Sequence, residues 1–245
     1  LELHKNNKLS EAEAMYNEVI KLEPLNAEAY VNLGIAQGQN KNYEQALLTL
    51  NNANVKFPNN KQVTDAIKSI NAQSTDAKLE TAANYFNNKD YQNAINEYLK
   101  ISPATSDTML GIASAYQNLG STDKAIEYYQ EAFKLAPANS DIAYYISALY
   151  AEKEDFENAN VFVQKALTLN KNNKQAQELS KMLAENKNSE VLTNAIALFD
   201  SEKYDESFAQ LNKLLAVDSK NAYGYYYRAM IYDTKQNYKE AAQWW

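Results

Sequence analysis

The stretch that decides the fold is Asn42-Tyr43-Glu44-Gln45-Ala46, because copies of it recur along the chain. The clearest copies are Asp90-Tyr91-Gln92-Asn93-Ala94, Asp155-Phe156-Glu157-Asn158-Ala159, Lys203-Tyr204-Asp205-Glu206-Ser207 and Asn237-Tyr238-Lys239-Glu240-Ala241, and two weaker ones are Lys8–Ala12 and Ser121–Ala125. The small residue that closes each copy stands at 12, 46, 94, 125, 159, 207 and 241, so the steps are 34, 48, 31, 34, 48 and 34 residues. Three equal steps of 34 identify an internal repeat.

Each repeat has the pattern of two helices. In one second helix, apolar residues recur with the 3.6-residue helical period, at Ala125, Ile126, Tyr129, Ala132 and Phe133. Short polar segments such as 40–42 and 120–123 separate the two helices of a repeat, and prolines at 24, 58, 103 and 137 end four of the second helices. A short turn makes the two helices antiparallel. A unit of this size buries its apolar face only by stacking on its neighbours, so we expect an all-α stack of helix pairs.

The residue types at fixed positions resemble the tetratricopeptide repeat (TPR) family. Two repeats carry that family's signature most fully, with Tyr30-x-x-Leu33-Gly34, Ala46, Leu50, Ala53 and Pro58 in one, and Met109-x-x-Ile112-Ala113-x-x-Tyr116, Ala125, Tyr129, Ala132 and Pro137 in the other. The chain departs from the signature at Lys171 and Ser219, which replace the proline, and at Lys78 and Val191, which replace the aromatic opener. The resemblance implies a right-handed superhelical solenoid of antiparallel helix pairs, with about seven repeat units of which the first and last are incomplete.

The two steps of 48 each hold 14 extra residues, which is ~4 helical turns. The insertion either lengthens the first helix of the next repeat or forms a separate amphipathic helix that covers the preceding repeat. We favour the separate helix, because Ser74-Thr75-Asp76 and Asn188-Ser189-Glu190 offer N-cap side chains at the junctions. Residues 1–73 are then the end of one module with a capping helix at about 61–73. Residues 74–186 form a complete three-repeat module with a capping helix at about 173–186, and residues 187–245 begin another.

Composition excludes most catalytic and cofactor-binding sites. The chain has no cysteine and a single histidine, His4, so thiolate chemistry, cysteine-based metal sites and a Ser-His-Asp triad are not expected, and neither is any cofactor. A net charge of −7 disfavours nucleic acid as a partner, and no run of eighteen apolar residues predicts a membrane span. The chain starts at Leu1 without methionine and stops at Trp244-Trp245 within an amphipathic pattern, so we expect a fragment of a longer protein. Its compartment stays open, with the cytoplasm slightly favoured.

The resemblance also implies which face binds a partner, since TPR proteins use the inner face of their first helices. On that face we expect partner-binding residues at Asn32, Leu110, Asp141, Tyr144, Tyr145, Tyr223, Tyr226 and Tyr227. For the tyrosines, packing between adjacent first helices is the alternative. The residues expected to point inward include acids and no Lys or Arg, so a partner is expected to be neutral to basic, with aromatic or aliphatic anchors. The leading function is a non-catalytic scaffold that binds a peptide or protein. The alternatives are a self-assembling scaffold and the regulatory or docking arm of a larger enzyme.

Overall fold

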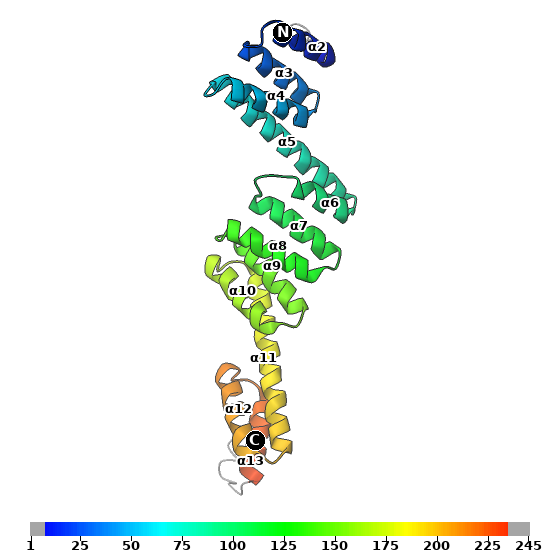
Figure 1. Cartoon of the computed structure of the whole chain (residues 1–245). Helices are drawn as coiled ribbons and strands as arrows, with labels where there is room; N and C mark the ends of the chain where they lie inside the picture. Colours follow the sequence, from blue (N-terminus) through cyan, green and yellow to red (C-terminus); the bar gives the residue numbers. More distant parts are fainter. Residues whose placement is uncertain (1–7, 235–245) are drawn as a thin grey trace. The chain divides into compact units, whose positions relative to one another are not determined.

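The computed structural model describes residues 8–234, and these residues form twelve helices and no strand (Figure 1). The helices are α2 (Leu9–Leu22), α3 (Ala27–Gln39), α4 (Tyr43–Lys56), α5 (Lys61–Asn87), α6 (Tyr91–Leu99), α7 (Ser106–Asn118), α8 (Thr122–Leu135), α9 (Ser140–Glu152), α10 (Phe156–Leu169), α11 (Lys174–Asp200), α12 (Tyr204–Val217) and α13 (Ala222–Thr234). The all-α repeat fold is thereby confirmed. His4, Tyr238 and the last copy of the repeat, which ends at Ala241, lie outside the described residues.

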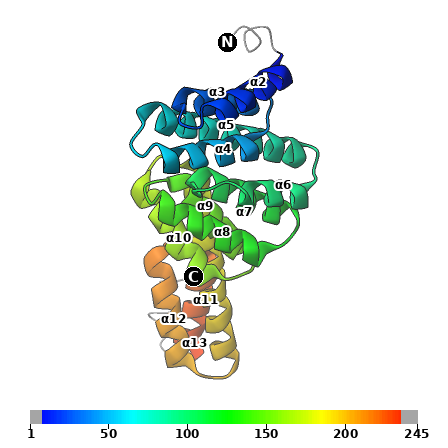
Figure 2. The same ribbon diagram turned by 45° about the horizontal axis from the view of Figure 1, so that its top comes forward.

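The chain divides into two compact units, residues 1–135 and residues 136–245. In the first unit, α3 pairs with α4, α5 with α6, and α7 with α8, and α2 packs on α3. In the second unit, α9 pairs with α10 and α11 with α12, and α13 packs on α12 and α11. Figure 2 shows α11, α12 and α13 lying side by side. Each unit is therefore a run of helix pairs, as the repeat predicts.

Small residues hold the two helices of each pair together. The residues that close the repeat motif (Ala12, Ala46, Ala94, Ala125, Ala159, Ser207) and the small residues of the first helices (Gly34, Ala82, Ala113, Ser147, Ala195, Ala229) are all buried. A Cβ added to Gly34 would lie 2.5 Å from Leu50 Cγ, closer than real Cβ atoms approach. The Ser207 hydroxyl donates to the Ala195 carbonyl oxygen at 2.7 Å. The repeat phase predicted from the sequence is therefore the phase of the packing.

The turns between paired helices share one backbone geometry. Lys41, Lys89, Gly120, Glu154 and Glu202 all occupy it with φ between 60° and 70°, in the left-handed region. At the first of these turns, the Asn42 N–H donates to the Gln37 carbonyl oxygen at 2.8 Å, a bond that satisfies a carbonyl at the end of α3. The repeated turn brings each second helix back antiparallel to the first.

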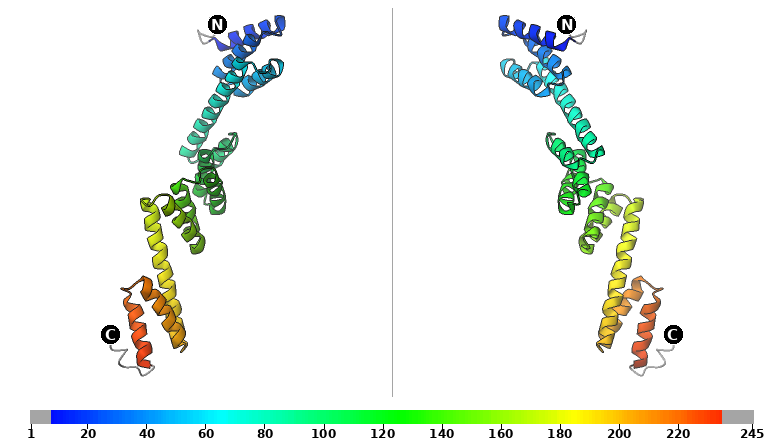
Figure 3. Two further views of the ribbon diagram at one scale, coloured as in Figure 1. Left: turned by 90° about the vertical axis from the view of Figure 1, so that its left-hand side faces the viewer. Right: turned by 90° about the vertical axis from the view of Figure 1, so that its right-hand side faces the viewer.

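The two 14-residue insertions do not form separate helices, and the interpretation that we favoured from sequence is wrong here. α5 and α11 are continuous helices of 27 residues each, visible as unbroken rods in Figure 3. Neither segment contains Gly or Pro, and ~4 added turns keep the apolar stripe close to its original phase. Ser74 and Ser189, which were expected near helix starts, lie in helix interiors. A side chain that can cap a helix does not by itself interrupt the backbone hydrogen bonds of a helix that continues past it.

The inserted residues still cover the preceding repeat, as a cap would. Val63 and Ile70 of α5 are buried against residues of α3 and α4 that include Tyr30 and Leu50. Leu179 and Leu183 of α11 are buried in the same way where α11 packs on α10 and α9. The boundaries at 73/74 and 186/187 therefore fall inside single helices. The division into modules 1–73, 74–186 and 187–245 stays a prediction.

Substituting Ala125 by Asp tests the repeat phase. Because Ala125 is fully buried at the contact between α7 and α8, Ala125→Asp places an unpaired carboxylate there, and we expect a loss of several kcal/mol from a typical total of ~5–15 kcal/mol. Chemical denaturation followed by circular dichroism measures it. Ala72→Asp is the matched control, because Ala72 is exposed within α5. Equal denaturation midpoints for the two variants would contradict this packing.

Proline substitution tests the continuity of α11. Lys187→Pro in the helix interior removes a backbone hydrogen bond and should lower the free energy of unfolding by ~3 kcal/mol. Lys174→Pro is the matched control, because Lys174 occupies the first helical position after the N-cap Asn173, where proline is tolerated. If the two variants unfold at the same denaturant concentration, α11 is interrupted near residue 187.

Candidate functional site

A cleft of about 740 Å³ lies in the second unit, between α9 and the N-terminal half of α11. Three segments form its walls: α9 from Tyr144 onward, the start of α10, and α11 from Gln175 to Asn186. The lining residues are Tyr144, Ala148, Ala151, Glu152, Phe156, Gln175, Glu178, Leu179, Met182, Leu183 and Asn186. We call this site the α9–α11 cleft.

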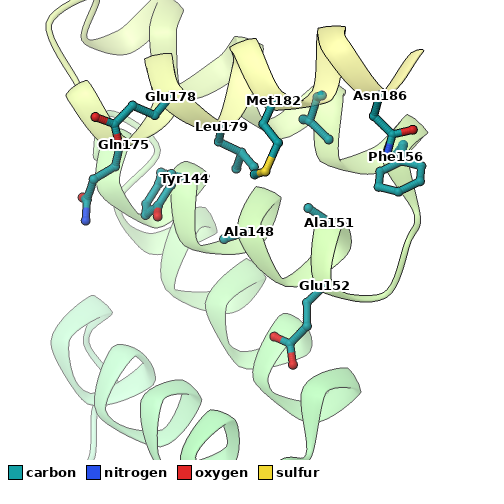
Figure 4. A pocket seen from close by; sticks show the side chains of 11 residues that line it. Tyr144, Ala148, Ala151, Glu152, Phe156, Gln175, Glu178, Leu179, Met182 and Asn186 are labelled. Carbon is teal, nitrogen blue, oxygen red and sulfur yellow. The ribbon is translucent and has the colours of Figure 1, made fainter. Parts of the chain in front are cut away.

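The middle of the α9–α11 cleft is apolar and its ends are polar or aromatic. Figure 4 shows Leu179 and Met182 of α11 directed toward Ala148 of α9. Gln175 and Glu178 lie at one end of the cleft in that view, and Asn186 lies near Phe156 at the other (Figure 4). Small residues at 148 and 151 leave room between the two helices, because alanine does not reach across the space that larger side chains would fill. The shape follows directly from that choice of residues.

Asn173 sets the start of α11 against the start of α9. Its side-chain oxygen accepts a hydrogen bond from the Ala176 N–H at 3.0 Å, which caps α11. Its side-chain nitrogen donates to Ser140 Oγ at 2.8 Å and to Asp141 Oδ1 at 2.9 Å. Asn173 is itself buried, so these bonds are shielded from water. One amide thus joins the two helices that form the cleft.

The charges that line the cleft are negative. Glu152 and Glu178 are its two acidic side chains, and no Lys or Arg belongs to the lining. The neighbouring Asp155 instead caps α10, and the hydrogen bonds from the side chain and then the backbone of Asn158 lower the pKa of its carboxyl group. Of the carboxylates near this turn, Asp155 therefore serves as a helix cap, whereas Glu152 lines the cleft.

The structure places the predicted partner-binding residues in three locations. In the second unit, Tyr144 lines the cleft, whereas Tyr145 is 38% exposed outside the lining and Asp141 is bound to Asn173. Tyr223, Tyr226 and Tyr227 lie together on α13, where the rings of Tyr226 and Tyr227 are 5.3 Å apart and Tyr227 also packs on Phe199. In the first unit, Asn32 on α3 and Leu110 on α7 are both half-buried.

Sequence reasoning missed the α11 wall of the cleft. Leu179, Met182 and Leu183 form part of an amphipathic stripe in the sequence, but a separate capping helix would have used that stripe for packing and not for binding. The alternative interpretation, in which the insertion lengthens the next first helix, would have predicted these three residues beside α9. If residues 174–186 continue into the next first helix, they occupy the position of a first helix beside α9. The α11 wall was missed because the apolar stripe was assigned to a separate capping helix and not to a lengthened first helix.

Within residues 8–234, the structure offers neither a metal cluster nor a membrane span. No group of three or more His, Cys, Asp or Glu side chains there is arranged to share a metal ion. Over the same residues, every helix is too short or too polar to cross a membrane.

Three protein-family models, each described as a tetratricopeptide repeat, match residues 3–70, 106–139 and 192–244, together more than half of the chain. None of the curated proteins matches the chain.

Solved structures with low sequence identity also resemble the chain. The TPR domain of P58(IPK) is 17% identical over 99% of this chain and 88% of that one, with a TM-score of 0.49. The TPR domain of OM64 from Arabidopsis is 20% identical over 47% of this chain and 98% of that one, with a TM-score of 0.43. The first TPR domain of Spaghetti (RPAP3), bound to the HSP90 peptide SRMEEVD, is 22% identical over 46% of this chain and 92% of that one, also with a TM-score of 0.43.

Removing the Asn173 side chain should loosen the cleft. Asn173→Ala deletes a helix cap and leaves the Ser140 and Asp141 side chains without this donor, so we expect a loss of ~2 kcal/mol of stability. Faster hydrogen exchange at the amides of the first turn of α11 should accompany it. Asn172→Ala is the matched control, since the side chain of Asn172 is exposed and makes no such bonds. Equal stability and exchange in the two variants would contradict this role.

Proposed function

The chain belongs to the tetratricopeptide repeat family, and on that premise we propose that it binds a peptide or protein segment in the α9–α11 cleft as a non-catalytic scaffold. The repeats make it a protein-interaction module. A stack of helix pairs presents side chains at a regular spacing along its surface, and this arrangement suits an extended or helical ligand.

The observation that carries the proposal is the solvent-accessible apolar surface in the cleft. Met182 is 57% exposed and Phe156 is 38% exposed, and both line the same hollow. An apolar anchor that is fully buried there contributes ~1.5–3 kcal/mol. Met182 suits such a contact because its unbranched, flexible side chain adapts to the shape of a partner. Tyr144 adds a ring whose face can contact an aliphatic or cationic side chain.

The charge of the cleft favours a neutral to basic partner. Glu152 and Glu178 offer acceptors to a Lys or Arg side chain, whereas an acidic segment would meet two carboxylates and no cation in the lining. The preferred ligand therefore combines an aliphatic or aromatic anchor for the middle of the cleft with a basic residue near one end.

The tyrosines of α13 form a second contact surface in this proposal. Tyr223 is 67% exposed and Tyr226 is 43% exposed, so both rings are accessible in the second unit. Tyrosine suits recognition because it offers a large contact area with few rotatable bonds. In the first unit, Asn32 and Leu110 remain proposed partner contacts. They offer less surface to a partner than the exposed tyrosines, since both are half-buried.

Selection of peptides from a random library on the full chain tests the proposal. Enriched peptides should carry a net positive charge and an aliphatic or aromatic anchor. Tyr144→Ala and Met182→Ala should each weaken their binding by at least ~1 kcal/mol, measured by fluorescence polarisation, because each removes a wall of the cleft.

Two controls make the result specific. Val161→Ala shortens an exposed apolar side chain of α10 outside the lining and should leave the affinity within about twofold, the range of an energetically minor contact. Glu152→Lys combined with Glu178→Lys should reverse the charge preference of the selected peptides.

Enrichment of peptides with acidic C-termini, and binding that is indifferent to Tyr144 and Met182, would refute the proposal. Light scattering of the unliganded chain would reveal self-assembly as the competing function.

A further inference from the structure

A second cleft, of about 280 Å³, lies in the first unit between the start of α4 and the middle of α5. Its lining is different in kind from that of the α9–α11 cleft, because polar and basic groups dominate it. The lining residues are Lys41, Asn42, Tyr43, Glu44, Ser74, Ala77, Lys78 and Thr81. We call this site the α4–α5 cleft.

Ser74 is the unusual residue of this cleft. Eight polar residues are buried among residues 8–234. In all of them except Ser74, a side-chain oxygen or nitrogen takes part in a hydrogen bond. These seven residues are Gln37, Thr49, Thr108, Ser140, Ser147, Asn173 and Ser207. Ser74 is only 7% exposed, and its hydroxyl has no partner among the described residues. A serine inside a helix can bond back to the carbonyl four residues earlier, as Thr81 does to Ala77 at 2.7 Å, and Ser74 does not. Ser74 lines the cleft, and its hydroxyl oxygen is open to the cleft rather than enclosed, so a ligand there can reach it.

The start of α4 supplies further unused donors. The backbone N–H groups of Tyr43, Glu44 and Gln45 have no acceptor within residues 8–234. The N-cap residue Asn42 makes no side-chain bond to them, whereas Asp90 at the corresponding place before α6 accepts from the Asn93 N–H. The first turn of a helix also carries a partial positive charge. An anion in this cleft would satisfy both the charge and the donors.

The charged side chains of the cleft favour an anion on balance. Lys41 and Lys78 line it, and Lys78 is held in place because its Nζ donates to the Lys100 carbonyl oxygen at 3.1 Å. An ammonium group has three donors, so Lys78 keeps two for a ligand. Glu44 is the one opposing charge in the lining, and it weakens the site without cancelling both lysines.

We propose that the α4–α5 cleft binds a phosphate group through the Ser74 hydroxyl, the Lys41 and Lys78 ammonium groups and the free amides at the start of α4. These donors come from three parts of the lining: α5, the turn before α4 and the start of α4 itself. Phosphate matches this set because it carries about −1.5 to −2 charges near neutral pH and strong acceptor oxygens. Its source is either free inorganic phosphate or a phosphorylated side chain of a partner.

Titration of the full chain with inorganic phosphate, followed by amide NMR at fixed ionic strength, tests the proposal. The resonances of Tyr43, Glu44, Gln45 and Ser74 should shift and saturate, and chloride at the same ionic strength should not reproduce this. Ser74→Ala should weaken phosphate by about two- to tenfold, the range of one hydrogen bond. It should leave thermal stability unchanged or raised, because the hydroxyl has no partner to lose. Lys78→Met should also weaken phosphate, and Glu44→Gln should strengthen it.

Matched controls lie on the same helix. Ser69→Ala and Lys68→Met change exposed residues of α5 outside the lining, and both should bind phosphate as the parent chain does. A phosphoserine peptide that binds more tightly than inorganic phosphate identifies a phosphorylated partner as the source, and the reverse order identifies free phosphate. Shifts that do not saturate, affinity that is unaffected by Ser74→Ala, or acetate that binds as tightly as phosphate would each overturn the proposal.

Discussion

The close contact between small residues in each helix pair is the constraint on which the rest of the structure depends. Where Gly34 faces Leu50, or the Ser207 hydroxyl reaches the Ala195 carbonyl, a larger side chain would push the two helices apart. Dense packing transmits such a displacement to neighbouring helices, since within each unit one pair packs on the next. The positions of the helices, and therefore the width of a cleft beside them, depend on these small buried residues.

The sequence predicts this framework well because its determinants are local and periodic. Small residues at 46, 125 and 159 report the helix–helix contact directly, and the prolines report where second helices end. The lengths of α5 and α11 depend instead on whether the helix ends or continues at the junction residues, and the local sequence is compatible with both. Ser74 and Asn188 can cap a helix or lie inside one, and the side-chain chemistry is the same in both cases. What decides is that the added turns keep the apolar stripe buried in both halves of the helix, which is a tertiary effect.

The candidate site was predictable in part for the same reason. Tyr144 was expected on the inner face from its phase in α9, and the cleft contains it. Tyr145 follows directly in sequence but lies outside the lining, because adjacent residues of a helix point about 100° apart. The opposite wall at Leu179 and Met182 could not be assigned without knowing that α11 is continuous. A hollow between two helices depends on both of their positions, and periodicity within one helix describes only its own faces.

The long helices also explain why both clefts occur beside them. In each unit, a 27-residue helix serves two repeats: its N-terminal half covers the preceding pair, and its C-terminal half pairs with the following helix. The direction of the long helix is therefore set partly by its contacts with the following helix. For that reason, side chains of the long helix do not fill every space against the preceding pair. At α11 the remaining space is apolar and bounded by Glu152 and Glu178, and at α5 it is polar and contains Ser74 and Lys78. The same insertion at two points of the repeat is therefore accompanied by two clefts of opposite chemistry, one apolar and acidic and one polar and basic.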